Sequence, residues 1–117
     1  MVTLNTLIRR IRNLNADRDW NQFHTFKDLS MSLSLEAAEV MEHFQWKSKK
    51  EEHDHLKHHR DALAEELADV QIYLLEIADK AHINILQAVQ DKLTKVEKKY
   101  PVSKYKSRHT NKFPTPK

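Results

Sequence analysis

Two short acidic stretches, EAAEV at residues 36–40 and ELADV at residues 66–70, organise this chain. Each places two carboxylates three residues apart, and at about 100° per residue such a pair projects from nearly the same side of a helix. Two acids so placed repel one another, so we expect a cation between them. If the two helices lie antiparallel, the four carboxylates converge. Clustered oxygen ligands of this kind suit Mg²⁺ or Mn²⁺.

The acids lie at the edges of apolar stripes. Leu33 and Val40 share one helical sector, and Glu36 lies directly beside it. An acidic pair alone is also typical of an ordinary solvated helix face, which is the simpler alternative. The opposite faces of both helices, however, are apolar too, because they carry residues such as Leu35 and Ile72. Acids between two apolar sectors indicate a function, and the second apolar face predicts an interface with another subunit.

The composition excludes several classes of site and bounds the chain to one domain. The 117 residues include no Gly, which excludes glycine-rich phosphate loops and tight primed hairpins. They include no Cys, which excludes disulfides, thiolate zinc sites and cysteine nucleophiles and fits a reducing compartment. No apolar run approaches the roughly 20 residues that span a bilayer, and no signal-peptide pattern opens the chain. We therefore expect a soluble, cytoplasmic protein without a membrane partner.

Apolar periodicity predicts an all-α fold, a four-helix bundle with short connections. Thr25 and Asn84 are typical N-cap residues, and Pro101 forbids continuation of the last helix. A highly charged segment over residues 47–55 is expected to form a loop. The predicted helices cover residues 3–16, 25–46, 57–81 and 85–100.

The C-terminal region is strongly basic. From Lys92 to Lys117, Glu97 is the single acid among many Lys and Arg residues. Such a segment serves solubility or binds a phosphorylated ligand. Nucleic acid is not an expected partner, because the chain has no recognised nucleic-acid module. We place the folded domain at residues 1–105 and a basic tail at residues 106–117.

Further segments carry a resemblance to a known family. RDWNQFH at residues 18–24 leads into the first acidic stretch, which is followed by FQW at residues 44–46. Tyr73 stands four residues after Asp69, and KKYPV follows at residues 98–102. Over about residues 4–105, the chain resembles the MazG-like all-α nucleoside triphosphate pyrophosphohydrolases. Within them it looks most like the dCTP pyrophosphatase branch.

This resemblance implies an enzyme with a MazG-type fold, assembled as a homodimer or homotetramer. Such enzymes cleave a nucleoside triphosphate between the α and β phosphates, and this branch implies dCTP or a related pyrimidine nucleotide. The resemblance also implies that Trp20, Trp46 and Tyr73 line the base pocket. The implied Mg²⁺ ligands are Glu36, Glu39, Glu66 and Asp69.

The chemistry of the reaction explains why the site needs both acidic and basic side chains. A triphosphate is strongly negative, so a pocket of carboxylates would repel it without a metal ion. Mg²⁺ reverses the sign of the pocket and lowers the pKa of a bound water, whose proton a carboxylate can take. We assign this general-base role to Glu36. On the last helix, Lys92, Lys95 and Lys99 are expected to hold the pyrophosphate, although an ordinary solvated face explains Lys95 equally well.

Two positions depart from the family pattern. Val96 stands where this branch usually shows Asn, and Val cannot hydrogen-bond a phosphate. Ile11 stands where some relatives carry His. Both changes bear on nucleotide preference and turnover and leave the proposed metal ligands untouched.

The chain has eight His, and five of them lie between His43 and His59. His55 and His59 have i,i+4 spacing, and His53-Asp54 resembles the paired ligands of another phosphohydrolase class. We interpret this segment as a surface histidine-rich loop, because no second Asp in a matching context supports that class. A ferritin-like di-iron site is disfavoured too, because it requires Glu-x-x-His.

A competing hypothesis from another functional class is a non-catalytic, oligomeric helical module. Such a module would bind nucleotide or nucleic acid through its basic tail, with a steep salt dependence and no turnover. The enzyme, in contrast, would release pyrophosphate only with a divalent metal.

Overall fold

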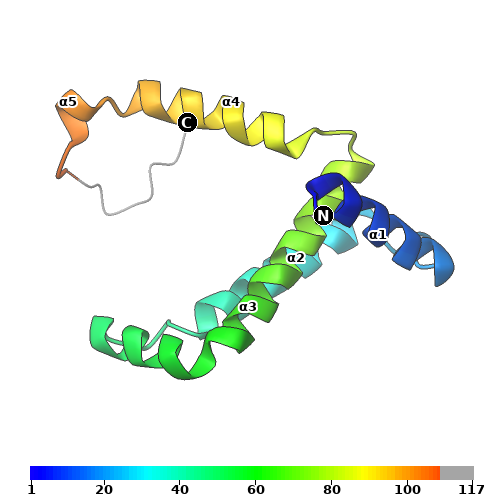
Figure 1. Ribbon diagram of the computed structural model, residues 1–117, viewed down its shortest axis with the longest axis horizontal. Coiled ribbons are helices and arrows are strands. Elements are labelled where there is room, and N and C mark those ends of the chain that lie inside the picture. Colours follow the sequence, from blue (N-terminus) through cyan, green and yellow to red (C-terminus); the bar gives the residue numbers. More distant parts are fainter. Residues whose placement is uncertain (109–117) are drawn as a thin grey trace. The chain divides into compact units, whose positions relative to one another are not determined.

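The computed structural model describes residues 1–108, and its regular secondary structure is entirely helical, which confirms the predicted all-α class (Figure 1). The chain forms two compact units, one from Met1 to His82 and a second from Ile83 onward. Within the described residues, none of the helices has the length and apolar character needed to cross a membrane. The helices are α1 (Leu4–Asp17), α2 (Phe26–Glu42), α3 (Lys49–Lys80), α4 (Ile85–Lys99) and the short α5 (Val102–Tyr105).

Side-chain caps begin the helices where the sequence indicates them. The Thr25 hydroxyl accepts a hydrogen bond from the backbone N–H of Asp28 at 3.1 Å. The Asn84 carbonyl oxygen likewise accepts from the N–H of Gln87 at 3.1 Å. Each bond satisfies one of the free donors of a first helical turn, which is why these residues start helices.

The predicted loop over residues 47–55 is wrong, because α3 begins at Lys49. Ser48 and Glu51 form a capping box: the Ser48 hydroxyl accepts from the Glu51 N–H at 3.2 Å, and the Ser48 N–H donates to the Glu51 carboxylate at 3.1 Å. The hydrogen bonds from the Ser48 backbone and side chain lower the pKa of Glu51 below its ordinary value. Two reciprocal bonds thus start a helix in a segment that has no apolar period.

The second helix is shorter than predicted, ending at Glu42 rather than near Trp46. After it, the Phe44 N–H donates to the Met41 carbonyl at 2.9 Å, and the Lys47 N–H donates to the Phe44 carbonyl at 3.0 Å. These bonds between residues three apart tighten the chain into turns and lead it into α3.

A kink divides α3 at His59, whose backbone leaves the helical region at φ −128° and ψ 23°. In Figure 1 the part before the kink runs in a different direction from the longer part after it. Next to the kink, the His58 Nδ1 lies 2.9 Å from the carbonyl oxygen of Asp54. A side chain that competes for a backbone carbonyl is a known cause of helix kinks.

The core of the first unit lies where α2 packs on α3, and α1 packs on α3 beside it. Leu29 from α2 and Leu75 from α3 are 1% and 2% exposed, and Ala78 is also buried. On α1, the Arg12 Nε donates to a carboxylate oxygen of Asp79 at 2.8 Å, and this hydrogen bond lowers the pKa of Asp79. The ion pair fixes α1 against the last turn of α3.

Candidate active site

The four predicted acids lie on the two helices that pack together, Glu36 and Glu39 on α2 and Glu66 and Asp69 on α3. The pKa of Glu36 is raised, first by burial, then by the hydrogen bond and charge of Glu39, and then by the charges of the two α3 acids. One oxygen of Glu36, Oε2, is buried and has no hydrogen-bond partner. The two helices therefore form a cluster in which each of the other three acids acts on Glu36.

This acid cluster is not a closed metal cage. Within residues 1–108, no three His, Asp or Glu side chains converge closely enough to hold a metal ion by themselves. Mg²⁺, however, keeps several waters and usually takes only one or two carboxylates together with substrate phosphates. The donor set of carboxylate oxygens, one of them buried without a partner, fits such an open site.

A chain of histidines leads away from the acid cluster. The Nε2 atom of His43 contacts Oε2 of Glu66, and the Nδ1 atom of His43 lies 2.6 Å from Nε2 of His55. The His55 ring stacks on the ring of His59, with their centroids 4.5 Å apart. The interpretation of this segment as a loop is therefore wrong, whereas its position at the surface is confirmed for His53, His58 and His59, which are exposed. The four histidines from His53 to His59 belong to α3, and His43, at the end of α2, bridges His55 to Glu66.

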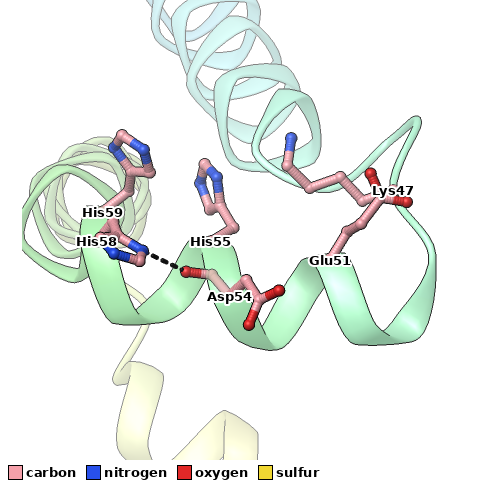
Figure 2. A pocket seen from close by; sticks show the side chains of 6 residues that line it. All are labelled: Lys47, Glu51, Asp54, His55, His58 and His59. Atoms are coloured by element: carbon pink, nitrogen blue, oxygen red, sulfur yellow. Dashed lines mark hydrogen bonds between the residues drawn. The ribbon is translucent and has the colours of Figure 1, made fainter.

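Three of the four histidines on α3 border a pocket of about 300 Å³ (Figure 2). Burial lowers the pKa of His55, and the neighbouring charges of His59, Lys47 and His43 lower it further, so its neutral form is favoured. The pocket is lined by Lys47, Glu51, Asp54, His55, His58 and His59.

The turn that carries Trp20 is connected through His24 to the buried carboxylate of Glu76. Trp20 donates its backbone N–H to the carbonyl of Asn15 at 2.9 Å, and its ring lies 6.1 Å from the ring of His24. The Nδ1 atom of His24 lies 2.9 Å from Oε2 of Glu76, which is only 6% exposed. Glu76 thus anchors the segment that carries one of the predicted pocket residues.

No ring-to-ring contact of the described residues joins two of the three predicted base-pocket aromatics. Trp46 is 87% exposed and Trp20 is 42% exposed, whereas Tyr73 on α3 is half-buried. None of the three lines the histidine pocket or a second cavity of about 320 Å³. Their role in binding a base stays a prediction. The second cavity is lined mainly by Leu7, Ile11 and Leu14 of α1 and by Ile72 and Leu75 of α3.

The predicted phosphate-binding lysines Lys92, Lys95 and Lys99 all lie on α4, in the second unit. The Lys99 ammonium lies 5.7 Å from the centre of the Tyr100 ring. Their role stays a prediction as well. Of the predicted basic tail at residues 106–117, residues 109–117 lie outside the described residues.

Sequence reasoning places His43 beside Glu36 and Glu39 at the edge of the apolar stripe but gives it no role in the site, and it misses Glu76 altogether. A signal for His43 is present, because it follows Glu39 by four residues and so shares the helical face of the acids. No comparable signal marks Glu76, since its partner His24 is distant in the sequence.

Comparisons with known proteins agree with one another. The chain matches the model of the MazG-like family over residues 31–112. It is 40% identical over 102 residues to dCTP pyrophosphatase 1 of Mus musculus, a match covering 86% of this chain and 60% of that protein. The corresponding protein of Homo sapiens is 37% identical over 101 residues, or 85% of this chain and 59% of that protein. The chain therefore spans about 60% of the length of these relatives.

A solved structure is similar over a larger share of its length. The crystal structure of a pyrophosphatase from Archaeoglobus fulgidus DSM 4304 superposes with a TM-score of 0.81 at 41% sequence identity. The match covers 86% of this chain and 94% of that one.

Proposed function

This chain belongs to the MazG-like family, and from that premise we propose that it hydrolyses a nucleoside triphosphate to a nucleoside monophosphate and pyrophosphate. Water hydrolyses the bond between the α and β phosphates, so that a nucleoside monophosphate and pyrophosphate leave. The names of the relatives, dCTP pyrophosphatase 1 and a pyrophosphatase, support this reaction. They also favour dCTP or a related pyrimidine nucleotide as the substrate. The activity would serve to remove unwanted nucleotides from the pool in the cytoplasm.

The observation that carries this proposal is the buried, unpartnered oxygen of Glu36 among three further acids. Buried carboxylates without partners are costly, and a protein retains them where a ligand satisfies them. A triphosphate is negative, so the ligand that joins it to this cluster is a divalent cation. We assign Mg²⁺ or Mn²⁺ to this place, with Glu36, Glu39, Glu66 and Asp69 as the residues that would hold it. When bound, the ion would neutralise phosphate charge and acidify the attacking water.

Glu36 is the best candidate for the general base. In the metal-free chain, burial and the neighbouring acids raise its pKa, which marks Glu36 as the acid of the cluster whose environment differs from that of an ordinary glutamate. Its Oε2 atom has no hydrogen-bond partner in the chain, so a water held by the cation could satisfy this oxygen and give up its proton to it. In Glu66, by comparison, His43 already occupies one oxygen.

We assign the aromatic residues to the base of the substrate and the lysines to its phosphates. Flat rings stack on a base, and the turn carrying Trp20 is anchored through His24 by the buried Glu76. Trp46 and Tyr73 are assigned to the same base pocket. The leaving pyrophosphate is assigned to the lysines of α4, Lys92, Lys95 and Lys99, whose positive charge suits it.

A screen of all common nucleoside triphosphates tests the proposal. Pyrophosphate release is measured for each nucleotide with Mg²⁺, with Mn²⁺ and with EDTA. We expect release from pyrimidine deoxynucleotides, dCTP foremost, and none in EDTA. Release of inorganic phosphate instead of pyrophosphate contradicts the proposed cleavage site. Nucleotide binding that weakens steeply with salt and leads to no turnover with either metal supports the non-catalytic module.

We also propose that the protein is a homodimer or homotetramer. Large apolar side chains stay exposed on α2, α3 and α4, and exposed patches of this kind usually mark interfaces. Burial of apolar surface contributes roughly 25 cal/mol per Å², so covering these side chains favours association. The exposed residues include Met31, Leu35 and Met41 of α2, Leu67 and Ile72 of α3, and Leu86, Val89 and Leu93 of α4.

Light scattering coupled to size-exclusion chromatography tests this association. We expect a mass of two or four chains at micromolar concentration. Leu35→Lys places a charge on the exposed face of α2 and should shift the mass toward the single chain, because desolvating that charge opposes assembly. Lys49→Gln, at an exposed charged position of α3, is the matched control and should leave the mass unchanged. A stable monomer of the unmodified protein would contradict the proposal.

A further inference from the structure

The histidines beside the acid cluster have no part in the reaction as described so far. We propose that His43 is a positioning residue for Glu66: it holds one carboxylate oxygen and so fixes which oxygen Glu66 presents to a divalent cation. This inference rests on the metal-dependent function proposed above and assigns a role to a residue outside the four acids.

His43 contacts both Glu66 and His55. It follows the end of α2, its side chain is only 9% exposed, and its Nε2 atom contacts Oε2 of Glu66 on α3. Its Nδ1 atom lies 2.6 Å from Nε2 of His55. Both ring nitrogens are therefore engaged, and a rotation of the ring would break both contacts.

The neighbours of His43 determine which of its nitrogens carries the proton. The neutral form of His55 is favoured, because burial and adjacent positive charges disfavour its protonation. A neutral His55 can donate its Nε2–H to Nδ1 of His43, which leaves the Nε2–H of His43 to donate to Glu66. His59 keeps the ring of His55 in place by stacking, and Figure 2 shows the two rings side by side. The hydrogen bonds thus run in one direction, from α3 through His43 to the acid.

As a consequence, the carboxylates of Glu66 and Glu36 have different roles. Glu66 has Oε2 occupied by His43 and so offers its other oxygen to a cation. Glu36 keeps a buried oxygen without a partner, which can accept a proton. Groups that hydrogen-bond a metal ligand orient it, and their loss typically lowers metal affinity or activity by about 10–100-fold.

Binding of Mn²⁺ to the nucleotide-free, full-length protein, followed by electron paramagnetic resonance, tests this role without reference to turnover. His43→Leu keeps the size of the side chain and removes the donor, and we expect Mn²⁺ affinity about 10–100-fold weaker than wild type. His43→Gln retains an N–H donor and should restore most of the affinity. The matched control is His53→Leu, at an exposed histidine on the same α3 helix, and it should bind as wild type.

The outcomes separate this inference from the proposed function. Wild-type Mn²⁺ affinity in His43→Leu overturns the inference, and an equal loss in His43→Gln overturns the role of the hydrogen bond. If circular dichroism shows that His43→Leu does not fold, His55→Leu decides: it keeps His43 but removes the partner that orients it, and wild-type affinity again overturns the inference. A wild-type protein that binds Mn²⁺ yet releases no pyrophosphate overturns the proposed function alone. At saturating metal, we expect His43→Leu to recover its KM for nucleotide and to retain a lower kcat.

Discussion

Glu39→Gln is expected to lower pyrophosphate release by well over 100-fold while leaving the helical content unchanged. Loss of a group that merely orients a metal ligand already costs about 10–100-fold, so loss of a proposed ligand should cost more. The substitution also removes a charge that raises the pKa of Glu36, so that pKa should fall toward the ordinary value of a glutamate. Steady-state kinetics and carboxyl-carbon NMR measure the two effects on the same protein.

Glu65→Gln is the matched control for this experiment. Glu65 is exposed on α3, directly beside Glu66 in the sequence, and it is not assigned to the site. We expect it to retain turnover, and we expect Asp69→Asn to behave as Glu39→Gln does. Because each site variant removes one of the like charges that repel one another, neither variant should be less stable than wild type in EDTA. Full activity of both site variants would contradict the mechanism.

Trp46→Ala is expected to weaken nucleotide binding by about 10–100-fold. Stacking of a base on an aromatic ring contributes about 1–3 kcal/mol, and each 1.4 kcal/mol corresponds to a tenfold change in affinity. Trp46 is 87% exposed in the single chain, so its removal should not disturb the fold. Stacking barely distinguishes one base from another, and the loss should therefore extend to every nucleotide tested. The metal requirement should stay.

Isothermal titration with a non-hydrolysable triphosphate analogue, alongside thermal unfolding, measures the two quantities separately. Phe26→Ala removes another exposed aromatic ring, at the start of α2, and serves as the control that should bind normally. If Trp46→Ala lowers the melting temperature without a separate binding defect, Trp46 is a packing residue and the pocket assignment is wrong.

Much of the fold follows from local signals that the sequence displays openly. The caps at Thr25 and Asn84 and the apolar period of each helix are properties of neighbouring residues, and the structure has both caps. The start of α3 is harder to predict from the sequence, because Ser48 and Glu51 begin a helix whose first turns have charges but no apolar stripe. The kink at His59 involves neither Pro nor Gly, so nothing in the local sequence announces it.

The candidate site likewise has parts that the local sequence predicts and parts that it does not. The acids are visible as pairs three residues apart, and their joint effect on Glu36 follows once α2 and α3 pack together. The contact of His43 with Glu66, and that of His24 with Glu76, depend on which turns of distant segments come face to face. Amphipathic periodicity predicts which face of a helix is covered, but the partner of a single polar side chain depends on the packing register.

The small core has a consequence for how the folding stability of this protein depends on its concentration. Among the described residues, the buried apolar side chains are Leu29, Leu75 and Ala78. So little buried surface is a weak counterweight to the conformational entropy that the chain loses on folding. In the oligomer that we propose, the missing free energy comes from association, so stability follows mass action. Dilution then acts as a denaturant, and a cell that holds few copies holds each of them less securely folded.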